Sequence, residues 1–253
     1  MLILLPPSET KRAGGTGAPL RWESLALPAL TAQRVSVVTA LEALSADEEA
    51  AARVLKLSAG QRGEIAVNGR IREAGTMAAV DRYTGVLFDA LDAASLESAA
   101  RRWLARNVLI HSAPFGPVGA LDRIPAYRLG AGAAVPGLPP LRRLWADSVT
   151  SALAERTPDI VVDLRSEAYV ALGPVPASVP SVYVRVVDAG ADGAVRALNH
   201  FNKHAKGVLV RALATSRPRI GSAAGLRRWA DAAGFRLEAG PGAELNLFAS
   251  AGA

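Results

Sequence analysis

Apolar residues follow two patterns along this chain, short unbroken runs and stripes with helical spacing. The runs at residues 1–5 (MLILL), 107–112 (NVLIHS) and 159–164 (DIVVDL) predict buried strands, because strands covered on both faces carry continuous apolar stretches. Helical spacing predicts helices over 30–57, 61–74, 77–91, 95–106, 141–156, 202–214 and 222–233. A capping-box-like start at Ser45 divides the first of these in two.

The remaining elements are shorter. Residues 181–188 and 194–200 alternate on either side of Ala191-Asp192-Gly193, which predicts a hairpin. Residues 127–129 predict a short strand, and 243–250 a final one. There is no internal repeat and no long linker. We therefore expect the α/β class (mixed α+β), as one domain over residues 1–253 with a mixed β-sheet surrounded by helices.

Composition narrows the class of protein. The chain has 253 residues, of which 50% are hydrophobic and 21% charged, so it is not a disordered protein. The first apolar run is too short to span a membrane and has no signal-peptide flanks, so we expect a soluble cytoplasmic protein. The absence of cysteine excludes disulfides, thiolate metal sites and cysteine nucleophiles. With only three histidines as well, we expect no metal site. We also expect no organic cofactor and no obligatory protein partner.

Positive charge is concentrated late in the chain. The net charge is +6, and residues 201–236 carry eight basic side chains but a single acidic one, Asp231. The basic residues are Lys203, Lys206, Arg211, Arg217, Arg219, Arg227, Arg228 and Arg236. Such a field attracts polyanions or phosphorylated small molecules. The alternative is that these side chains merely solvate ordinary surface faces.

The predicted helix from Asn202 carries part of this charge. On a helical wheel, Lys203, Lys206, Gly207 and Arg211 share one arc opposite an apolar side. The glycine would let a ligand approach the backbone closely. The alternative is a surface helix whose lysines only face solvent.

Small polar and charged residues follow two of the predicted buried strands. Ser8, Glu9 and Lys11 come after the first strand, and Ser166 and Glu167 after DIVVDL. If the two strands are parallel neighbours, these side chains meet at one end of the sheet, where ligands of α/β proteins usually bind. Two carboxylates near a lysine suit acid–base chemistry, or equally a structural ion pair. Ser8 and Lys11 match S-x-x-K, but the flanking prolines and glycines predict a loop there, which disfavours a serine acyl-enzyme.

An irregular turn is expected at Gly116-Pro117-Val118-Gly119. It has the glycine pattern of a helix-hairpin-helix element, whose backbone amides can hold a DNA phosphate. The four tryptophans, among them Trp145 on the apolar side of its helix, are expected to pack in the core.

Six spaced segments together resemble the YaaA family, which is associated with the peroxide stress response. They are MLILLPPSETK, DRYTGVLFDAL, HSAPFGPVGALDRIPAYRL, LRRLWADSVT, DIVVDLRSEAY and NHFNKHAKGVLVR, in the family's order. The resemblance implies a YaaA-like α/β fold with a basic cleft, DNA binding partly through a helix-hairpin-helix element, and a cytoplasmic role in limiting damage linked to free iron. By the same resemblance, the family's motif positions correspond to Ser8, Lys11, Tyr83, Tyr127, Arg128, Trp145, Ser166, Tyr169, Lys203, Lys206 and Arg211.

Two functional hypotheses follow. The leading one is a DNA-binding protein of the peroxide stress response that contacts the phosphate backbone through Lys11, Arg128, Lys203, Lys206, Arg211, Arg227 and Arg228. The alternative is an enzyme acting on a phosphate-bearing or nucleobase-like small molecule, with Ser8, Glu9, Lys11, Tyr83, Ser166, Glu167 and Lys203 around one pocket. In both, the late cationic side chains must meet the loop after the first strand. Iron handling is a third possibility, for which only carboxylates are available as ligands.

Overall fold

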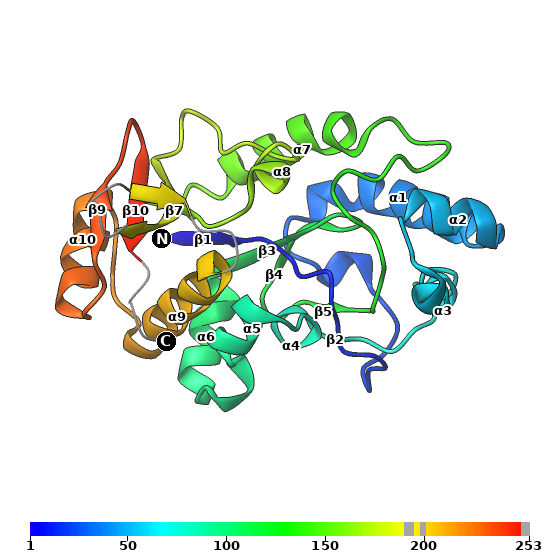
Figure 1. Ribbon diagram of the computed structural model, residues 1–253, viewed down its shortest axis with the longest axis horizontal. Coiled ribbons are helices and arrows are strands. Elements are labelled where there is room, and N and C mark those ends of the chain that lie inside the picture. Colours follow the sequence, from blue (N-terminus) through cyan, green and yellow to red (C-terminus); the bar gives the residue numbers. More distant parts are fainter. Residues whose placement is uncertain (190–194, 198–200, 249–253) are drawn as a thin grey trace.

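An eight-stranded mixed sheet runs through the centre of the molecule (Figure 1). The computed structural model describes residues 1–189, 195–197 and 201–248. The strands lie in the order β4-β3-β1-β6-β7-β10-β9, and β8 also pairs with β7. Their bounds are Leu2–Leu5 (β1), Val108–Ser112 (β3), Gly116–Gly119 (β4), Val161–Asp163 (β6), Ser181–Ala189 (β7), Val195–Ala197 (β8), Leu237–Ala239 (β9) and Glu244–Phe248 (β10).

Five neighbouring strands, β3, β1, β6, β7 and β10, are parallel, whereas β4, β8 and β9 each pair antiparallel. Ile3 of β1 pairs with Val108 of β3 on one side and with Val162 of β6 on the other. The predicted parallel pairing of the first strand with DIVVDL is thus confirmed. The chain leaves β1 toward β3 and later returns to its other side through β6. Such a reversal opens a crevice at the carboxyl ends of the two strands.

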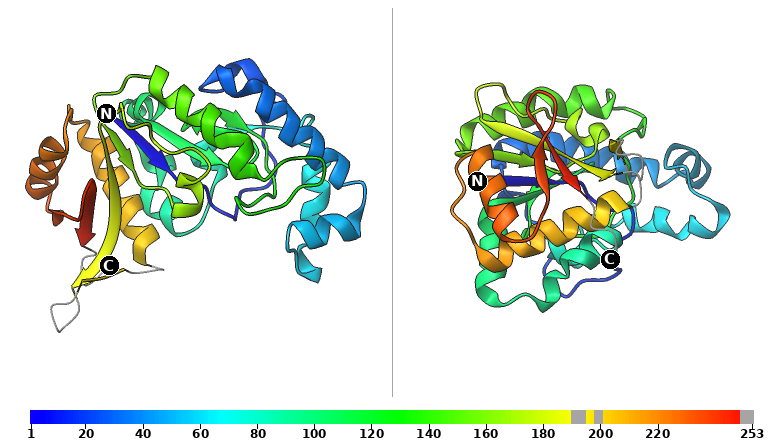
Figure 2. Two further views of the ribbon diagram at one scale, coloured as in Figure 1. Left: turned by 90° about the horizontal axis from the view of Figure 1, so that it is seen from above. Right: turned by 60° about the vertical axis from the view of Figure 1, so that its left-hand side comes forward.

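Helices cover both faces of the sheet. In Figure 1, α5, α6 and α9 lie below the strands, and α1, α7 and α8 lie above them. Figure 2 shows α10 and the β9–β10 hairpin at one end of the molecule and α2 and α3 at the other. The helices are Thr31–Leu44 (α1), Glu48–Val54 (α2), Gly63–Asn68 (α3), Ala79–Arg82 (α4), Val86–Leu91 (α5), Ser98–Asn107 (α6), Leu141–Glu155 (α7), Glu167–Val170 (α8), Phe201–Ser216 (α9) and Ala223–Ala232 (α10). A two-stranded sheet pairs Met77–Ala78 (β2) with Arg123–Ile124 (β5).

The mixed α/β class predicted from the sequence is confirmed, and the core lies where the apolar runs predict it. All residues of β1, β3 and β6 are buried. Trp145 is fully buried, and its indole Nε1 donates a hydrogen bond to the carbonyl oxygen of Ala113 at 3.0 Å. The other three tryptophans also pack in or against the core. No helix in the described ranges combines the length and apolar character needed to cross a membrane.

Several predicted elements differ from the structure at their ends. Helix α2 begins after Asp47, whose carboxylate accepts a hydrogen bond from the amide of Ala50, so Asp47 and not Ser45 caps it. The predicted helix over 77–91 is divided into β2, α4 and α5, because Gly85 has a φ of 92° that interrupts a helix.

Residues 127–129 form no strand, and the strand predicted at 243–250 is observed as Glu244–Phe248. The predicted turn at residues 191–193 lies outside the described residues.

The segment Gly116–Gly119 corrects another prediction. It forms strand β4, antiparallel to β3, and all four of its residues are buried. The segment is therefore not the exposed irregular turn that was expected, and the amide of Gly119 donates a hydrogen bond to the Asp122 carboxylate at 2.7 Å. A strand fits here because the preceding turn at residues 113–115 returns the chain directly along β3.

Candidate functional site

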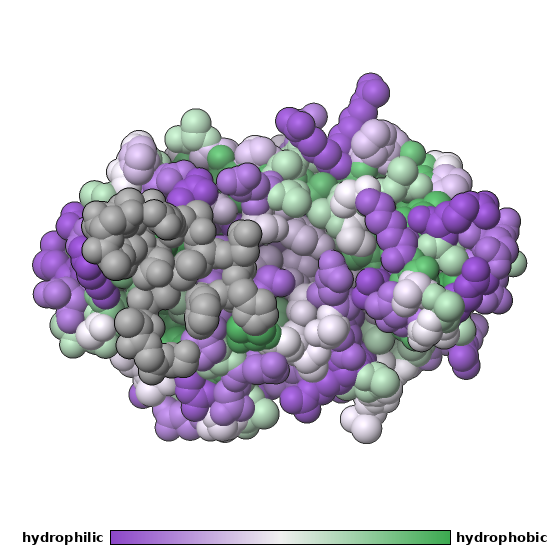
Figure 3. Space-filling model, viewed as in Figure 1, coloured by the Kyte–Doolittle hydropathy of each residue, from purple (hydrophilic) through white to green (hydrophobic). Residues whose placement is uncertain are grey.

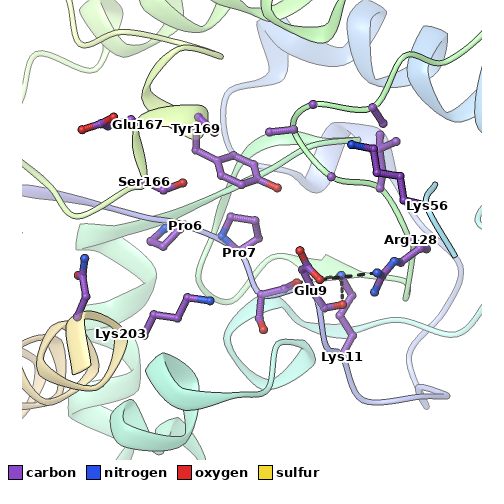
Figure 4. A pocket seen from close by; sticks show the side chains of 18 of the residues that line it. Pro6, Pro7, Glu9, Lys11, Lys56, Arg128, Ser166, Glu167, Tyr169 and Lys203 are labelled. Atoms are coloured by element: carbon purple, nitrogen blue, oxygen red, sulfur yellow. Dashed lines mark hydrogen bonds and ion pairs between the residues drawn. The ribbon is translucent and has the colours of Figure 1, made fainter. Parts of the chain in front are cut away.

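A pocket of about 930 Å³ opens where the carboxyl ends of β1 and β6 meet. Seen from the side used in Figure 1, the surface is hollowed near its centre (Figure 3). The close view in Figure 4 shows side chains from several segments around this hollow. Its walls come from the loop after β1, the end of α2, the loop at residues 128–133, the start of α8, strand β7 and the first turns of α9.

The loop after β1 places Lys11 at the pocket. Pro6 and Pro7 follow the strand directly and interrupt its hydrogen-bonding pattern, since proline has no amide hydrogen. The Lys11 ammonium donates hydrogen bonds to the carbonyl oxygens of Ser8 at 3.0 Å and Glu9 at 3.1 Å. It also lies 4.1 Å from the centroid of the Tyr127 ring. The side chain thus turns back over its own loop and is held at one end of the pocket.

The surroundings of Lys11 disfavour its charged form. Burial, followed by the nearby Arg128 guanidinium, lowers the pKa of Lys11 from 10.5 to about 7, although Glu64 and Glu9 act in the opposite direction. Arg128 itself forms ion pairs with Glu9 at 3.7 Å and Glu64 at 3.4 Å. An amine with this pKa is partly deprotonated at neutral pH, whereas an ordinary lysine is almost fully protonated there.

The first turns of α9 supply the opposite end of the pocket. Lys203 is exposed, whereas Lys206 is only 4% exposed and lies 5.9 Å from the centroid of the Tyr183 ring on β7. Burial lowers the pKa of Lys206 to about 8, opposed by the attraction of Asp163 and assisted by Arg185. In Figure 4, Lys203 and Lys11 lie on opposite sides of the hollow, with Pro7 and Tyr169 between them.

A buried ion pair supports the wall formed after β6. The Nε and Nη2 of Arg165 donate hydrogen bonds to the Asp163 carboxylate at 2.9 and 2.6 Å, and its Nη1 lies 2.9 Å from His111 Nδ1. Arg165 is fully buried and Asp163 is 4% exposed. Directly after this pair, Ser166 precedes α8 and Glu167 begins it. The rigid pair thus fixes where the loop leaves the sheet.

The structure brings most of the predicted site residues together. Ser8, Glu9, Lys11, Arg128, Ser166, Glu167, Lys203 and Lys206 all line this pocket. Glu167 is 3.6 Å from Arg185 and Glu9 is 3.7 Å from Arg128, so both candidate carboxylates form ion pairs with arginines and not with a lysine.

Other predicted residues lie elsewhere. Tyr83 is 2% exposed and sits beneath Lys11, with its hydroxyl 2.8 Å from that of Tyr127, so it does not line the pocket. Arg211 donates hydrogen bonds to the carbonyl oxygens of Leu91 and Asp92, each at 2.9 Å. Arg227 and Arg228 are exposed on α10, at the far end of the molecule.

Gly207 has a different role from the predicted one. A side chain there would meet the carbonyl oxygen of Leu87 on α5, and the residue is buried between the two helices. The glycine therefore lets α9 approach α5 and not a ligand.

Lys56, Tyr183 and Arg185 also line the pocket and were not among the predicted site residues. Tyr183 and Arg185 alternate with buried residues along β7, and Lys56 directly follows the end of α2. No local motif marks them. The described residues also contain no cluster of three or more histidine, aspartate or glutamate side chains able to hold a metal ion.

Comparison with known proteins identifies the family. The family model for the peroxide stress protein YaaA matches residues 1–240. The chain belongs to this family. It is 46% identical over 252 residues to a UPF0246 protein of Corynebacterium efficiens, with 98% of each chain covered. A UPF0246 protein of Streptomyces coelicolor is 48% identical over 219 residues, covering 84% of this chain and 82% of the relative. The YaaA resemblance inferred from six segments is thus confirmed.

Proposed function

We propose that this YaaA-family protein binds a phosphate-bearing small molecule in the pocket at β1 and β6 and acts on it as an enzyme of the peroxide stress response. The observation that carries the proposal is the pair Lys11 and Lys206. Segments almost 200 positions apart in the sequence bring both lysines to one pocket, and both pKa values are lowered toward neutrality. Perturbed amines gathered in a cavity are typical of sites that bind anions or transfer protons.

The α9 end of the pocket suits a phosphate group. Lys203 and Lys206 lie in the first two turns of a helix of 16 residues, where the helix dipole adds partial positive charge. Arg185 lies on the neighbouring strand, although Glu244 holds its guanidinium in place at 2.9 Å. Binding of an anion beside Lys206 would also recover part of the desolvation cost of its buried ammonium.

The Lys11 end suits proton transfer. The amine of Lys11 is the base best matched to neutral pH in this pocket. Burial raises the pKa of Tyr169, so its hydroxyl stays protonated and is a hydrogen-bond donor. Ser8 and Ser166 add hydroxyl groups at the same carboxyl edge of the sheet. The flat ring of Tyr169, which reaches into the hollow in Figure 4, also offers a surface for a nucleobase-like ligand.

Calorimetric titration tests this function. Nucleotides, sugar phosphates and inorganic phosphate are titrated into the wild-type protein and into Lys206→Met, which keeps the length of the side chain without its charge. We expect at least one of these compounds to bind, and Lys206→Met to weaken that binding at least about tenfold, since a desolvated charged contact is worth more than about 1.4 kcal/mol. Arg228→Ala, on the distant α10, serves as the matched control. If no phosphate compound binds, the proposal is wrong.

DNA binding, with the role in limiting damage linked to free iron, remains a second candidate. It is favoured by the exposed cations Lys203, Arg227 and Arg228 on the last two helices. Backbone binding of DNA requires exposed cations rather than an enclosed pocket, and its affinity falls steeply with salt. The two candidates therefore predict opposite variant effects. Arg227→Ala with Arg228→Ala weakens DNA binding and spares the small molecule, while Lys206→Met does the reverse.

A further inference from the structure

The lysines of this chain are unusually placed. Only four of its 29 basic residues are lysines, and all four, Lys11, Lys56, Lys203 and Lys206, line the same pocket. The 25 arginines are spread over the rest of the molecule, and of the described ones only Arg128 and Arg185 reach this pocket. Everywhere else in the chain, arginine supplies the positive charge. The pocket is thus the one place where lysine is used.

Charge alone does not explain this distribution. A guanidinium binds phosphate at least as well as an ammonium, because its planar donors contact two oxygens at once. A lysine can do what an arginine cannot, which is to lose its proton near neutral pH and attack a carbon atom with the free amine. A pocket that keeps lysines in an arginine-rich chain therefore points to amine chemistry.

Lys11 has the geometry for this chemistry. A neutral amine has two hydrogens and one lone pair, and the carbonyl oxygens of Ser8 and Glu9 accept two hydrogen bonds from the Lys11 nitrogen. Both of these contacts survive deprotonation, so the amine stays in place and its lone pair points away from the two carbonyls. Arg128 adds a neighbouring positive charge, and the buried Tyr83–Tyr127 pair forms an apolar base beneath the side chain. Desolvation beside another cation is an established way of activating a lysine nucleophile.

We propose that Lys11 is a nucleophile that forms an imine with a phosphate-bearing aldehyde or ketone held in this pocket. The inference rests on the proposed function, in which Lys203 and Lys206 anchor the phosphate. Lys203 lies across the hollow from Lys11 (Figure 4). The Lys11 lone pair attacks the carbonyl carbon; the nitrogen gives up one proton as the former carbonyl oxygen takes one up, which gives a carbinolamine. A second proton then goes to the hydroxyl, which leaves as water while the nitrogen loses its remaining hydrogen as a proton, and this gives a C=N bond. Hydrolysis by the reverse steps regenerates the amine.

Two neighbouring groups assist these steps. The Tyr169 hydroxyl reaches into the hollow between the phosphate end and Lys11, where it can donate a hydrogen bond to the carbonyl oxygen. The Ser8 hydroxyl, 3.2 Å from that of Thr10, lies on the same loop as Lys11. No metal or redox cofactor is required, since imine formation and hydrolysis only exchange water.

Reductive trapping tests the proposal. The full-length protein is mixed with substoichiometric pyridoxal 5′-phosphate, which carries both an aldehyde and a phosphate, and is then treated with borohydride. Because only four lysines are present, peptide mass spectrometry assigns each adduct without ambiguity. An Arg102→Lys variant adds a reference amine on the exposed surface of α6. We expect Lys11 to be labelled at least about tenfold more than this reference lysine, because a lowered pKa leaves far more of its amine neutral.

Two controls separate this inference from the function on which it rests. Pyridoxal without its phosphate should lose the preference for Lys11, since it lacks the anchored group. Lys11→Arg should abolish the main adduct while binding of inorganic phosphate persists, and Lys11→Met repeats the test if the arginine is not accommodated. Labelling of the reference lysine at the same level as Lys11 would overturn the imine proposal. If the wild-type protein binds no phosphate compound, the proposed function is wrong instead.

Discussion

Lys11 lies over the ring of Tyr127, with its nitrogen 4.1 Å from the ring centroid, and Tyr127 shares a 2.8 Å hydrogen bond with Tyr83. Both tyrosines are buried, at 3% and 2% exposure. The amine at the pocket thus rests on aromatic rings whose hydroxyl groups are hydrogen-bonded to each other. This arrangement explains why Tyr83, a predicted catalytic residue, supports Lys11 from below instead of facing the hollow.

The tyrosine pair is expected to behave as one unit. Tyr127→Phe leaves the Tyr83 hydroxyl buried without this partner and should lower the free energy of unfolding by about 1–3 kcal/mol. Adding Tyr83→Phe removes the orphaned hydroxyl, so the double variant should lose less than the sum of the two single variants. Urea unfolding of all four proteins measures this coupling. Strictly additive losses would show that the hydrogen bond contributes nothing.

The two lowered lysine pKa values make stability depend on pH. Between about 7 and 10.5 for Lys11, and between about 8 and 10.5 for Lys206, the unfolded chain binds protons that the folded protein has released. Stability should therefore rise with pH through this range, by at most about 1.4 kcal/mol per pH unit for each amine. Above pH 10.5 the lysines no longer contribute and the trend reverses, because burial raises the pKa of Tyr83 and Tyr127, and the unfolded tyrosines ionise first.

Unfolding free energies measured from pH 6 to 10 test this slope. The double variant Lys11→Met and Lys206→Met should flatten it, because neither folded nor unfolded methionine titrates. A matched variant that removes exposed charge, Arg102→Met, should leave the slope unchanged. A wild-type protein whose stability is level from pH 7 to 9 would contradict the buried state of these amines.

Lys56 occupies its position at a conformational cost. Its φ is 54°, in the left-handed region, and it stands just past α2, where Leu57 donates a hydrogen bond to the Ala52 carbonyl oxygen in a Schellman motif. Glycine is the residue this position favours, so Lys56→Gly should raise the free energy of unfolding by about 1 kcal/mol. If Lys56 contacts the ligand, the same variant should bind phosphate compounds more weakly. Urea unfolding measures the gain in stability, and calorimetry measures the loss of affinity. Lys56→Asn is a second test, because asparagine also tolerates the left-handed backbone conformation.

Removal of Arg165 should be among the most damaging changes. Arg165→Met leaves the Asp163 carboxylate buried without its guanidinium, a loss of about 3–5 kcal/mol in proteins where such pairs are broken. Adding Asp163→Asn removes the uncompensated charge and should recover part of that loss. Thermal and urea unfolding of the single and double variants report the effect. Equal stability of Arg165→Met and wild type would show that the pair does not hold the loop after β6.

Local patterns in the sequence determined the elements around β1 and β6. Unbroken apolar runs of this length favour covered strands, and the polar residues that follow parallel strands emerge at the carboxyl edge of the sheet. These two rules are enough to bring Ser8, Lys11 and Ser166 to one site. The basic arc of the late helix adds Lys203 and Lys206 by the same kind of local reasoning.

The tertiary structure decided what each helix face touches. A helical wheel puts Lys206, Gly207 and Arg211 in one arc, yet Lys206 faces β7, whereas Gly207 and Arg211 face α5. Which neighbour packs against a face depends on contacts between segments far apart in sequence, and periodicity carries no information about them. For the same reason the sequence did not predict Lys56 as a pocket residue, because its position depends on how the end of α2 packs against the rest of the molecule. Residue spacing along one segment shows which side is polar, but only the packing of the other segments shows whether that side meets a ligand, a strand or another helix.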